Sequence, residues 1–293
     1  MVIKRPTFFF IHAQMGFKMT IYTDSHCHLD FPEFDFDRDD IRARCWEIGV
    51  NRLFVPGVSP DQWYRLYEMC DAAGRLSHIR GPECVFGIGI HPWWLEGVFG
   101  VPGSEKGFSY WQDIVEKAES LLANPRCVAV GECGLDKNKA ENFTFQQQVL
   151  EWHMALAESV QKPLVLHCVG AHAETLSAIK RANPAKAGVV HAFSGSYEIA
   201  RQYWDLGFRL GVGGTITYER AKKTRDAIKK LPIEALLLET DAPSMPLHGQ
   251  QGERNSPLNI PPICAALAKL RGLDHDEVAR QTTQNFTDVF GRG

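Results

Sequence analysis

Residues 127–168 read CVAVGECGLDKNKAENFTFQQQVLEWHMALAESVQKPLVLHC, and this stretch decides the fold class. Two short apolar runs, 127–134 and 164–168, flank a longer segment over 145–160, in which apolar residues recur every three or four positions. That spacing predicts an amphipathic helix, and the short runs are typical of buried strands. A strand, a helix and a second strand in this order form the unit from which parallel sheets are built.

The same alternation of short apolar runs and longer amphipathic segments continues from about residue 20 to the C-terminus. Eight such units point to an α/β fold with a closed (β/α)₈ barrel, the TIM barrel, rather than an open sheet. That fold takes about 250 residues, so we expect residues 19–293 to form one domain. The glycine-rich segment 97–107 is predicted to be a long loop. The predicted strands cover residues 21–29, 52–58, 85–91, 127–134, 164–168, 188–193, 208–213 and 235–241.

The composition is that of an ordinary globular protein, with 44% hydrophobic and 23% charged residues. A formal net charge of −3 provides no broad basic surface, which excludes nucleic-acid binding driven mainly by counterion release. No stretch approaches the roughly 20 apolar residues of a membrane helix. The eight cysteines are scattered singly, without a Cys-x-x-Cys pair. We therefore expect buried thiols, a reducing cytoplasmic setting and no membrane association.

The first 18 residues do not match the pattern that follows them. Lys4 and Arg5 precede an apolar run that faintly resembles a signal peptide. His12 interrupts that run, which is shorter than the apolar core of about 7–15 residues in such peptides. We therefore expect residues 1–18 to be a non-native or disordered extension and Met19 to be the natural start.

Six ionisable residues stand at the C-terminal ends of the predicted strands. In a (β/α)₈ barrel these ends converge on one face, where the active sites of such enzymes are found. The spacing of two between His26 and His28 places both side chains on the same side of their strand, so both can reach one ion. The six residues are His26 and His28 on the first strand, Glu132 on the fourth, His167 on the fifth, His191 on the sixth and Asp241 on the eighth.

Imidazole and carboxylate ligands suit zinc, manganese or iron, and carboxylates also suit magnesium. A structural zinc site closes with four ligands, so six ligands favour two divalent ions that share a bridging carboxylate and keep open positions for water and substrate. Each residue taken singly also has a structural explanation. Glu132 alone is explained equally by a buried carboxylate with a hydrogen-bonding partner, and Asp241 alone by a helix cap. To explain all six residues in this way, however, requires six separate coincidences at equivalent strand ends.

Four motifs carry a resemblance to a known family: DSHCH at 24–28, GECGLD at 131–136, HAFSG at 191–195 and ETDAP at 239–243. They resemble the signatures of TatD-related metal-dependent hydrolases, which are amidohydrolase-type TIM barrels. The segment 188–257 is most similar to the YjjV branch of that family. The resemblance covers roughly residue 20 to the C-terminus.

The resemblance implies deoxyribonuclease-like hydrolysis of phosphodiester bonds, dependent on divalent metal. His26 and His28 would bind one ion, His167 and His191 would bind the second, and Glu132 would bridge the two. DNA or another phosphodiester is then the expected substrate.

The resemblance also assigns roles to residues beside the metal ligands. Asp241 would bind the first ion and manage a proton, which makes it, with Glu132, a predicted catalytic residue. His91 matches a family histidine that contacts the substrate phosphate. The family commonly has an arginine where this chain has Val169, and valine cannot clamp a phosphate. His172 and Arg254 are therefore predicted to bind substrate in its place.

Three functions remain open from the sequence. The first is a TatD-type deoxyribonuclease that cleaves phosphodiesters with a metal-activated water. The second keeps the chemistry but acts on an amide, ester or lactone in a small molecule, because this fold supports both reactions. The third is a non-catalytic nucleic-acid-binding protein, against which the weak net charge and the complete ligand set argue.

Overall fold

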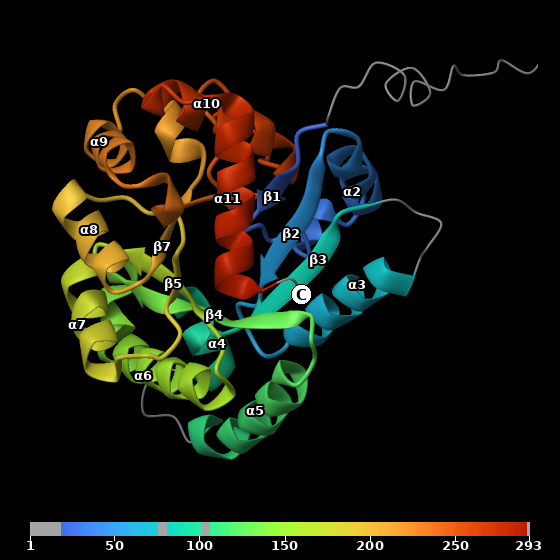
Figure 1. Cartoon of the computed structure of the whole chain (residues 1–293). Coiled ribbons are helices and arrows are strands. Elements are labelled where there is room, and N and C mark those ends of the chain that lie inside the picture. The colour runs from blue at the N-terminus through green and yellow to red at the C-terminus, as the bar shows by residue number, and fades with distance from the viewer. Residues whose placement is uncertain (1–18, 76–80, 101–105, 292–293) are drawn as a thin grey trace, which may run out of the picture.

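The computed structural model describes residues 19–75, 81–100 and 106–291. Eight strands lie in the order β1 to β8, and every neighbouring pair is parallel. Helices alternate with the strands and surround them (Figure 1), which confirms the predicted (β/α)₈ barrel. The strands are β1 (Tyr22–Asp24), β2 (Val50–Pro56), β3 (Glu83–Ile88), β4 (Cys127–Asp136), β5 (Leu164–Val169), β6 (Gly188–Val190), β7 (Arg209–Val212) and β8 (Leu236–Leu238).

The helices follow the strands in sequence, and several begin or end with short 3₁₀ turns. The helix predicted over 145–160 is present as α6, two residues longer at its start. The helices are α2 (Arg38–Glu47), α3 (Trp63–Arg75), α4 (Leu95–Phe99), α5 (Lys106–Leu122), α6 (Phe143–Val160), α7 (His172–Ala182), α8 (Tyr197–Asp205), α9 (Lys222–Lys230), α10 (Ile260–Arg271) and α11 (His275–Phe290). The 3₁₀ turns are η1 (Pro32–Phe34), η2 (Pro92–Trp94), η3 (Lys137–Asn142), η4 (Gly214–Thr217), η5 (Ile233–Ala235) and η6 (Pro257–Asn259).

Backbone hydrogen bonds beside β1 and β8 join the first strand to the last. The Ser25 N–H donates to the Leu238 carbonyl at 2.9 Å, and the Asp241 N–H donates to the His26 carbonyl at 2.8 Å. The His28 N–H donates at 2.7 Å to the carbonyl of the residue after Asp241. These bonds therefore fix three of the predicted metal ligands against one another.

The end of the barrel that lies opposite the predicted metal ligands is closed by α11, which lies across it in Figure 1. Its residues Phe286 and Phe290 pack against apolar side chains inside the barrel, and the rings of Phe54 and Phe290 stack with centroids 5.0 Å apart. This end of the barrel is thus filled with side chains, as expected where the fold is stabilised and not where catalysis takes place. The other buried members of this cluster are Val85, Val128, Ala129, Val165, Val189 and Leu237.

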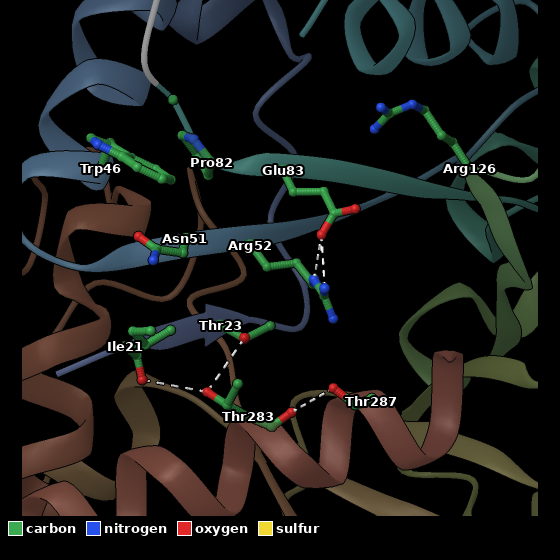
Figure 2. Close-up of a pocket in the computed structure, with 11 residues that line it drawn as sticks. Ile21, Thr23, Trp46, Asn51, Arg52, Pro82, Glu83, Arg126, Thr283 and Thr287 are labelled. Carbon is green, nitrogen blue, oxygen red and sulfur yellow. Dashed lines mark hydrogen bonds and ion pairs between the residues drawn. The ribbon is translucent and has the colours of Figure 1, made fainter. Parts of the chain in front are cut away.

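A cavity of about 510 Å³ lies between α11 and the N-terminal ends of the first strands (Figure 2). Thr283 and Thr287 line it from α11, and Arg52 and Glu83 form an ion pair at 2.8 Å across β2 and β3. Among the described residues that line it, Glu83 is the one carboxylate, and it is already paired. The predicted ligands do not line this cavity, so the two ends of the barrel are chemically different.

Several predicted boundaries are wrong. β1 ends at Asp24 and β8 at Leu238, so His26, His28 and Asp241 follow their strands instead of closing them. The backbone of Asp241 has a φ of 55°, a left-handed conformation that a strand cannot continue through. The loop predicted over 97–107 is partly helical, because α4 runs to Phe99 and α5 begins at Lys106.

Other predictions concern the termini, the cysteines and membranes. The predicted extension, residues 1–18, lies outside the described residues. All eight cysteines are free and seven are buried, as the sequence predicts. Within the part of the chain that the structure describes, none of the helices combines the length and apolar character of a membrane span.

Phe286, 1% exposed, should contribute strongly to the stability of the barrel. Phe286→Ala removes a ring that fills the closed end and leaves a cavity, so we expect the free energy of unfolding to fall by about 3–5 kcal/mol. Gln284→Ala, on an exposed position of the same helix, should change it by less than about 0.5 kcal/mol. Urea denaturation of both variants measures the difference, and equal midpoints would contradict the role given to α11.

Candidate metal centre

Glu132 lies at the centre of the residues predicted to bind metal. It belongs to β4, 1% of its surface is exposed, and its two carboxylate oxygens face different side chains. The Nε2 atoms of His26 and His28 lie 3.2 and 3.5 Å from Oε2. Asp241 Oδ1 lies 3.6 Å from both of these nitrogens. We call His26, His28, Asp241 and Glu132 Oε2 the first donor group.

The second donor group surrounds the other oxygen of Glu132. His191 Nε2 lies 2.8 Å and His167 Nδ1 lies 3.1 Å from Oε1. The two nitrogens are 3.2 Å apart. The structure therefore brings together all the residues that the sequence singles out as ligands, in two groups that share one carboxylate.

The spacing of the donor atoms fits bound cations. Tetrahedral ligands about 2.0–2.1 Å from a zinc ion are about 3.3 Å apart, and the donor atoms here are separated by 2.8 to 3.6 Å. Glu132 Oε2 is buried and accepts no hydrogen bond in the described part of the chain. Burying such an oxygen without a positive partner is costly. Nitrogen and carboxylate donors of this kind suit zinc or manganese, and the carboxylates also suit magnesium.

His167 is oriented by Asp136, a residue that sequence reasoning did not single out. His167 Nε2 lies 3.2 Å from Asp136 Oδ2, so a proton on Nε2 leaves the Nδ1 lone pair facing Glu132. Such carboxylate–histidine pairs orient the metal-binding histidines of many enzymes. Burial lowers the pKa of His167, but its hydrogen bonds with Asp136 and Glu132 outweigh burial and raise the pKa to about 9. Without a cation this histidine would therefore hold a second proton.

His91 lies beside the second donor group but presents a proton to it. Its Nε2 is 3.3 Å from Glu132 Oε1, within reach of a shared cation. The backbone N–H of Trp93, however, donates to His91 Nδ1 at 3.1 Å, so the neutral ring carries its proton on Nε2. Burial lowers the pKa of His91 to about 4, which keeps the ring neutral at pH 7. We therefore expect His91 to act as a hydrogen-bond donor toward the site and not as a metal ligand.

The two carboxylates of the donor groups remain ionised. Burial raises the pKa of Glu132, but the surrounding histidines, His191 foremost, outweigh burial and hold the pKa well below its ordinary value. Burial also raises the pKa of Asp241, but its hydrogen bond with His28 and the charges of the nearby histidines outweigh burial and lower the pKa. Burial lowers the pKa of His26 to about 4. Two ionised carboxylates beside a neutral imidazole form an environment that attracts cations.

Sequence reasoning missed two further buried carboxylates, Asp24 and Glu239. Asp24 accepts hydrogen bonds from the His26 N–H at 3.1 Å and from the N–H and hydroxyl of Thr240 at 3.1 and 2.6 Å. Glu239 accepts one at 2.5 Å from the backbone N–H that follows His191. Each carboxylate precedes a predicted ligand by two residues, the spacing that puts side chains on one side of a strand. That spacing is the signal by which both could have been found.

Two residues predicted to bind substrate lie outside both donor groups. His172 Nε2 is 3.0 Å from the Ser194 carbonyl oxygen, and its Nδ1 is 3.1 Å from the Tyr203 hydroxyl. Arg254 donates to both oxygens of the Asp37 carboxylate, at 3.0 and 2.5 Å. Both side chains already have protein partners, and the structure does not bring either of them to Glu132.

Known proteins resemble this chain over nearly its whole length. The profile of the family described as TatD related DNase matches residues 23–291. YjjV, an uncharacterized metal-dependent hydrolase of Escherichia coli, is 36% identical over 270 residues, covering 92% of this chain and 97% of YjjV. A Klebsiella pneumoniae protein named 3′-5′ ssDNA/RNA exonuclease TatD is 31% identical over 277 residues, with coverages of 92% and 97%. The crystal structure of E. coli YjjV aligns with a TM-score of 0.80 at 35% identity, covering 94% of this chain and 100% of that one. The resemblance inferred from the four motifs is confirmed.

The tautomer of His91 predicts that two buried histidines behave differently when removed. His26→Ala deletes a donor, so we expect metal affinity to fall by more than the about 10- to 100-fold typical of residues that only orient a ligand. His91→Ala should leave the metal content unchanged. Elemental analysis after loading with zinc and dialysis distinguishes the two, with His248→Ala, an exposed histidine, as control. Equal loss of metal from both variants would make His91 a ligand.

Proposed function

The chain belongs to the family of TatD-related DNases and is a metal-dependent hydrolase, and from that premise we propose that it is a nuclease with two divalent cations in its active site. The carrying observation is the placement of Glu132, which directs one oxygen to each of two donor groups. A carboxylate in that position is the bridge that a two-ion site requires.

In this proposal the first donor group holds one ion and the second holds the other, with zinc, magnesium or manganese as candidates. Cations bound there would supply Lewis acidity, which lowers the pKa of water and stabilises charge on the phosphate. Glu132 would keep the two sites at a fixed separation. The ionised state of both Glu132 and Asp241 supports this assignment, because their negative charge offsets the positive charge of the cations.

Asp241 and His91 take the remaining steps. Asp241 is ionised, and 14% of its side chain is exposed, so it can accept a proton from the attacking water and return it to the leaving oxygen. His91 donates its Nε2 proton to a non-bridging phosphate oxygen, which holds the phosphate against the donor groups. His172 and Arg254 would contact the substrate further from the reacting bond, since both already bond to protein groups.

A nucleic-acid substrate is supported by the relative from Klebsiella pneumoniae, whose name is that of a single-strand exonuclease. The free state of all eight cysteine thiols supports our proposal of a cytoplasmic enzyme. The competing proposal is an amide, ester or lactone hydrolase, and Val169, exposed where the family commonly has a phosphate-clamping arginine, favours it.

A substrate comparison separates the two proposals. A 5′-labelled oligonucleotide is incubated with the protein beside a panel of amides, esters and lactones, with zinc, manganese or magnesium added back after chelation. Cleavage of the oligonucleotide that depends on added metal supports the nuclease. Turnover of the small molecules without any cleavage of the oligonucleotide would replace it with the alternative.

Asp241→Asn should separate metal binding from turnover. The amide keeps the shape and one oxygen ligand but cannot take a proton, so we expect metal to be retained and kcat to fall by about 10²- to 10⁴-fold. Asp205→Asn, an exposed carboxylate on α8, is the control and should act as the wild type. Near-normal turnover in Asp241→Asn would remove Asp241 from the proton transfer.

A further inference from the structure

Three aromatic side chains line the edge of the two donor groups. The ring of Phe31 stacks on His28 of the first donor group, with centroids 4.5 Å apart and planes at 26°. Trp94 lies 6.1 Å from Phe31 and 6.4 Å from Trp93. The ring of Trp93 in turn lies 6.5 Å from that of His167 in the second donor group. We call Phe31, Trp93 and Trp94 the aromatic rim.

Trp93 is held in place although much of its ring faces solvent. Its indole Nε1–H donates to Asp136 Oδ2 at 2.7 Å, and its backbone N–H donates to His91 Nδ1 at 3.1 Å. Yet 56% of the residue is exposed. An apolar ring that is both ordered and exposed has already lost rotamer freedom, which favours binding of a partner to its open face.

We propose that the exposed face of Trp93 is a stacking site for an unpaired nucleobase of the substrate, an inference that rests on the nuclease function proposed above. The polar N–H of the indole is already used by Asp136, so a flat π surface is what remains for a ligand. Bases offer such a surface whatever their identity, and stacking on aromatic side chains holds single strands without sequence preference. In a duplex the faces of a base are covered by its neighbours.

The position of Trp93 fits a nucleotide whose phosphate is held at the donor groups. His91 and Trp93 are two residues apart, and their rings lie 5.5 Å apart at 88°. One short segment therefore presents a proton donor for the phosphate and a platform for a base. The net charge of −3 cannot provide affinity through a basic surface. Stacking supplies affinity that the surface charge does not.

Two labelled single strands of equal length test the stacking site. One is hexathymidylate, and in the other tetrahydrofuran abasic units replace every nucleotide except the labelled one. Trp93→Ala should lower kcat/KM for the thymidylate by about 5- to 150-fold, the range of one stacked base, and leave the abasic strand within about twofold of the wild type. Binding of both strands in EDTA, followed by fluorescence anisotropy, should show the same selective loss.

Trp93→Phe separates stacking from the support that Trp93 gives to Asp136. Phenylalanine keeps a flat ring but lacks the N–H, so this variant should retain most of the preference for thymidylate over the abasic strand. Tyr64→Ala on α3 is a matched control, because Tyr64 is 55% exposed and packs on Tyr67 and Lys117. The metal content of every variant is measured alongside.

The outcomes are distinguishable. A selective loss with thymidylate in Trp93→Ala, restored in Trp93→Phe, establishes the site. Equal losses on both strands in both variants would mean that Trp93 acts only by positioning Asp136, and the proposal would fall. If the wild type cuts neither strand with any added metal, the nuclease function fails. The anisotropy comparison then still decides the stacking site, since equal binding of both strands by wild type and Trp93→Ala would overturn it.

Discussion

Burying the carboxylate of Glu132 inside the barrel costs free energy unless positive charge surrounds it, and the rest of the site follows from that constraint. Its oxygens face imidazole nitrogens at 2.8 to 3.5 Å on both sides. A protonated His167 can offset part of that charge, but burial drives His26 toward its neutral form. Cations offset the charge of the carboxylate and also use the neutral ring of His26 as a ligand, so the arrangement favours a metal centre.

For two of the rings, those of His167 and His91, the orientation is set by the partner of the second nitrogen. Asp136 binds Nε2 of His167 and leaves Nδ1 for the donor group. The Trp93 N–H occupies Nδ1 of His91 and so makes that ring a proton donor. Two histidines at similar distances from Glu132 are thereby suited to the opposite roles that we propose, His167 as a ligand and His91 as a donor to phosphate. The hydrogen bond on the far side of the ring, and not the distance, distinguishes these two proposed roles.

The fold and the ligand set could be predicted because both follow periodic patterns. Alternating apolar runs predict the barrel, and ionisable residues at strand ends predict that Glu132 and His191 meet. The boundaries of β1 and β8 were wrong, since a left-handed residue such as Asp241 has no signature in apolar spacing. Asp24 and Glu239 were missed because a position two residues before a predicted ligand is a weak signal until the hydrogen-bond partners of the carboxylate are known. The partners of Arg254 were likewise hidden, because Asp37 is 217 residues away along the chain.

One end of the barrel contributes to stability and the other carries the donor groups. Both depend on the seam, by which we mean the backbone hydrogen bonds that join β1 and the residues after it to β8 and the residues after it. The bond from the Asp241 N–H to the His26 carbonyl joins the first strand to the last and also sets the separation of two ligands. Asp24 reinforces the same seam by accepting from both sides. Any change that loosens the seam therefore moves the first donor group, whereas the second is carried by the neighbouring strands β4 and β5 and by the residue that follows β6. Three residues of the first donor group thus depend on closure of the barrel, whereas the second depends on the pairing of β4, β5 and β6.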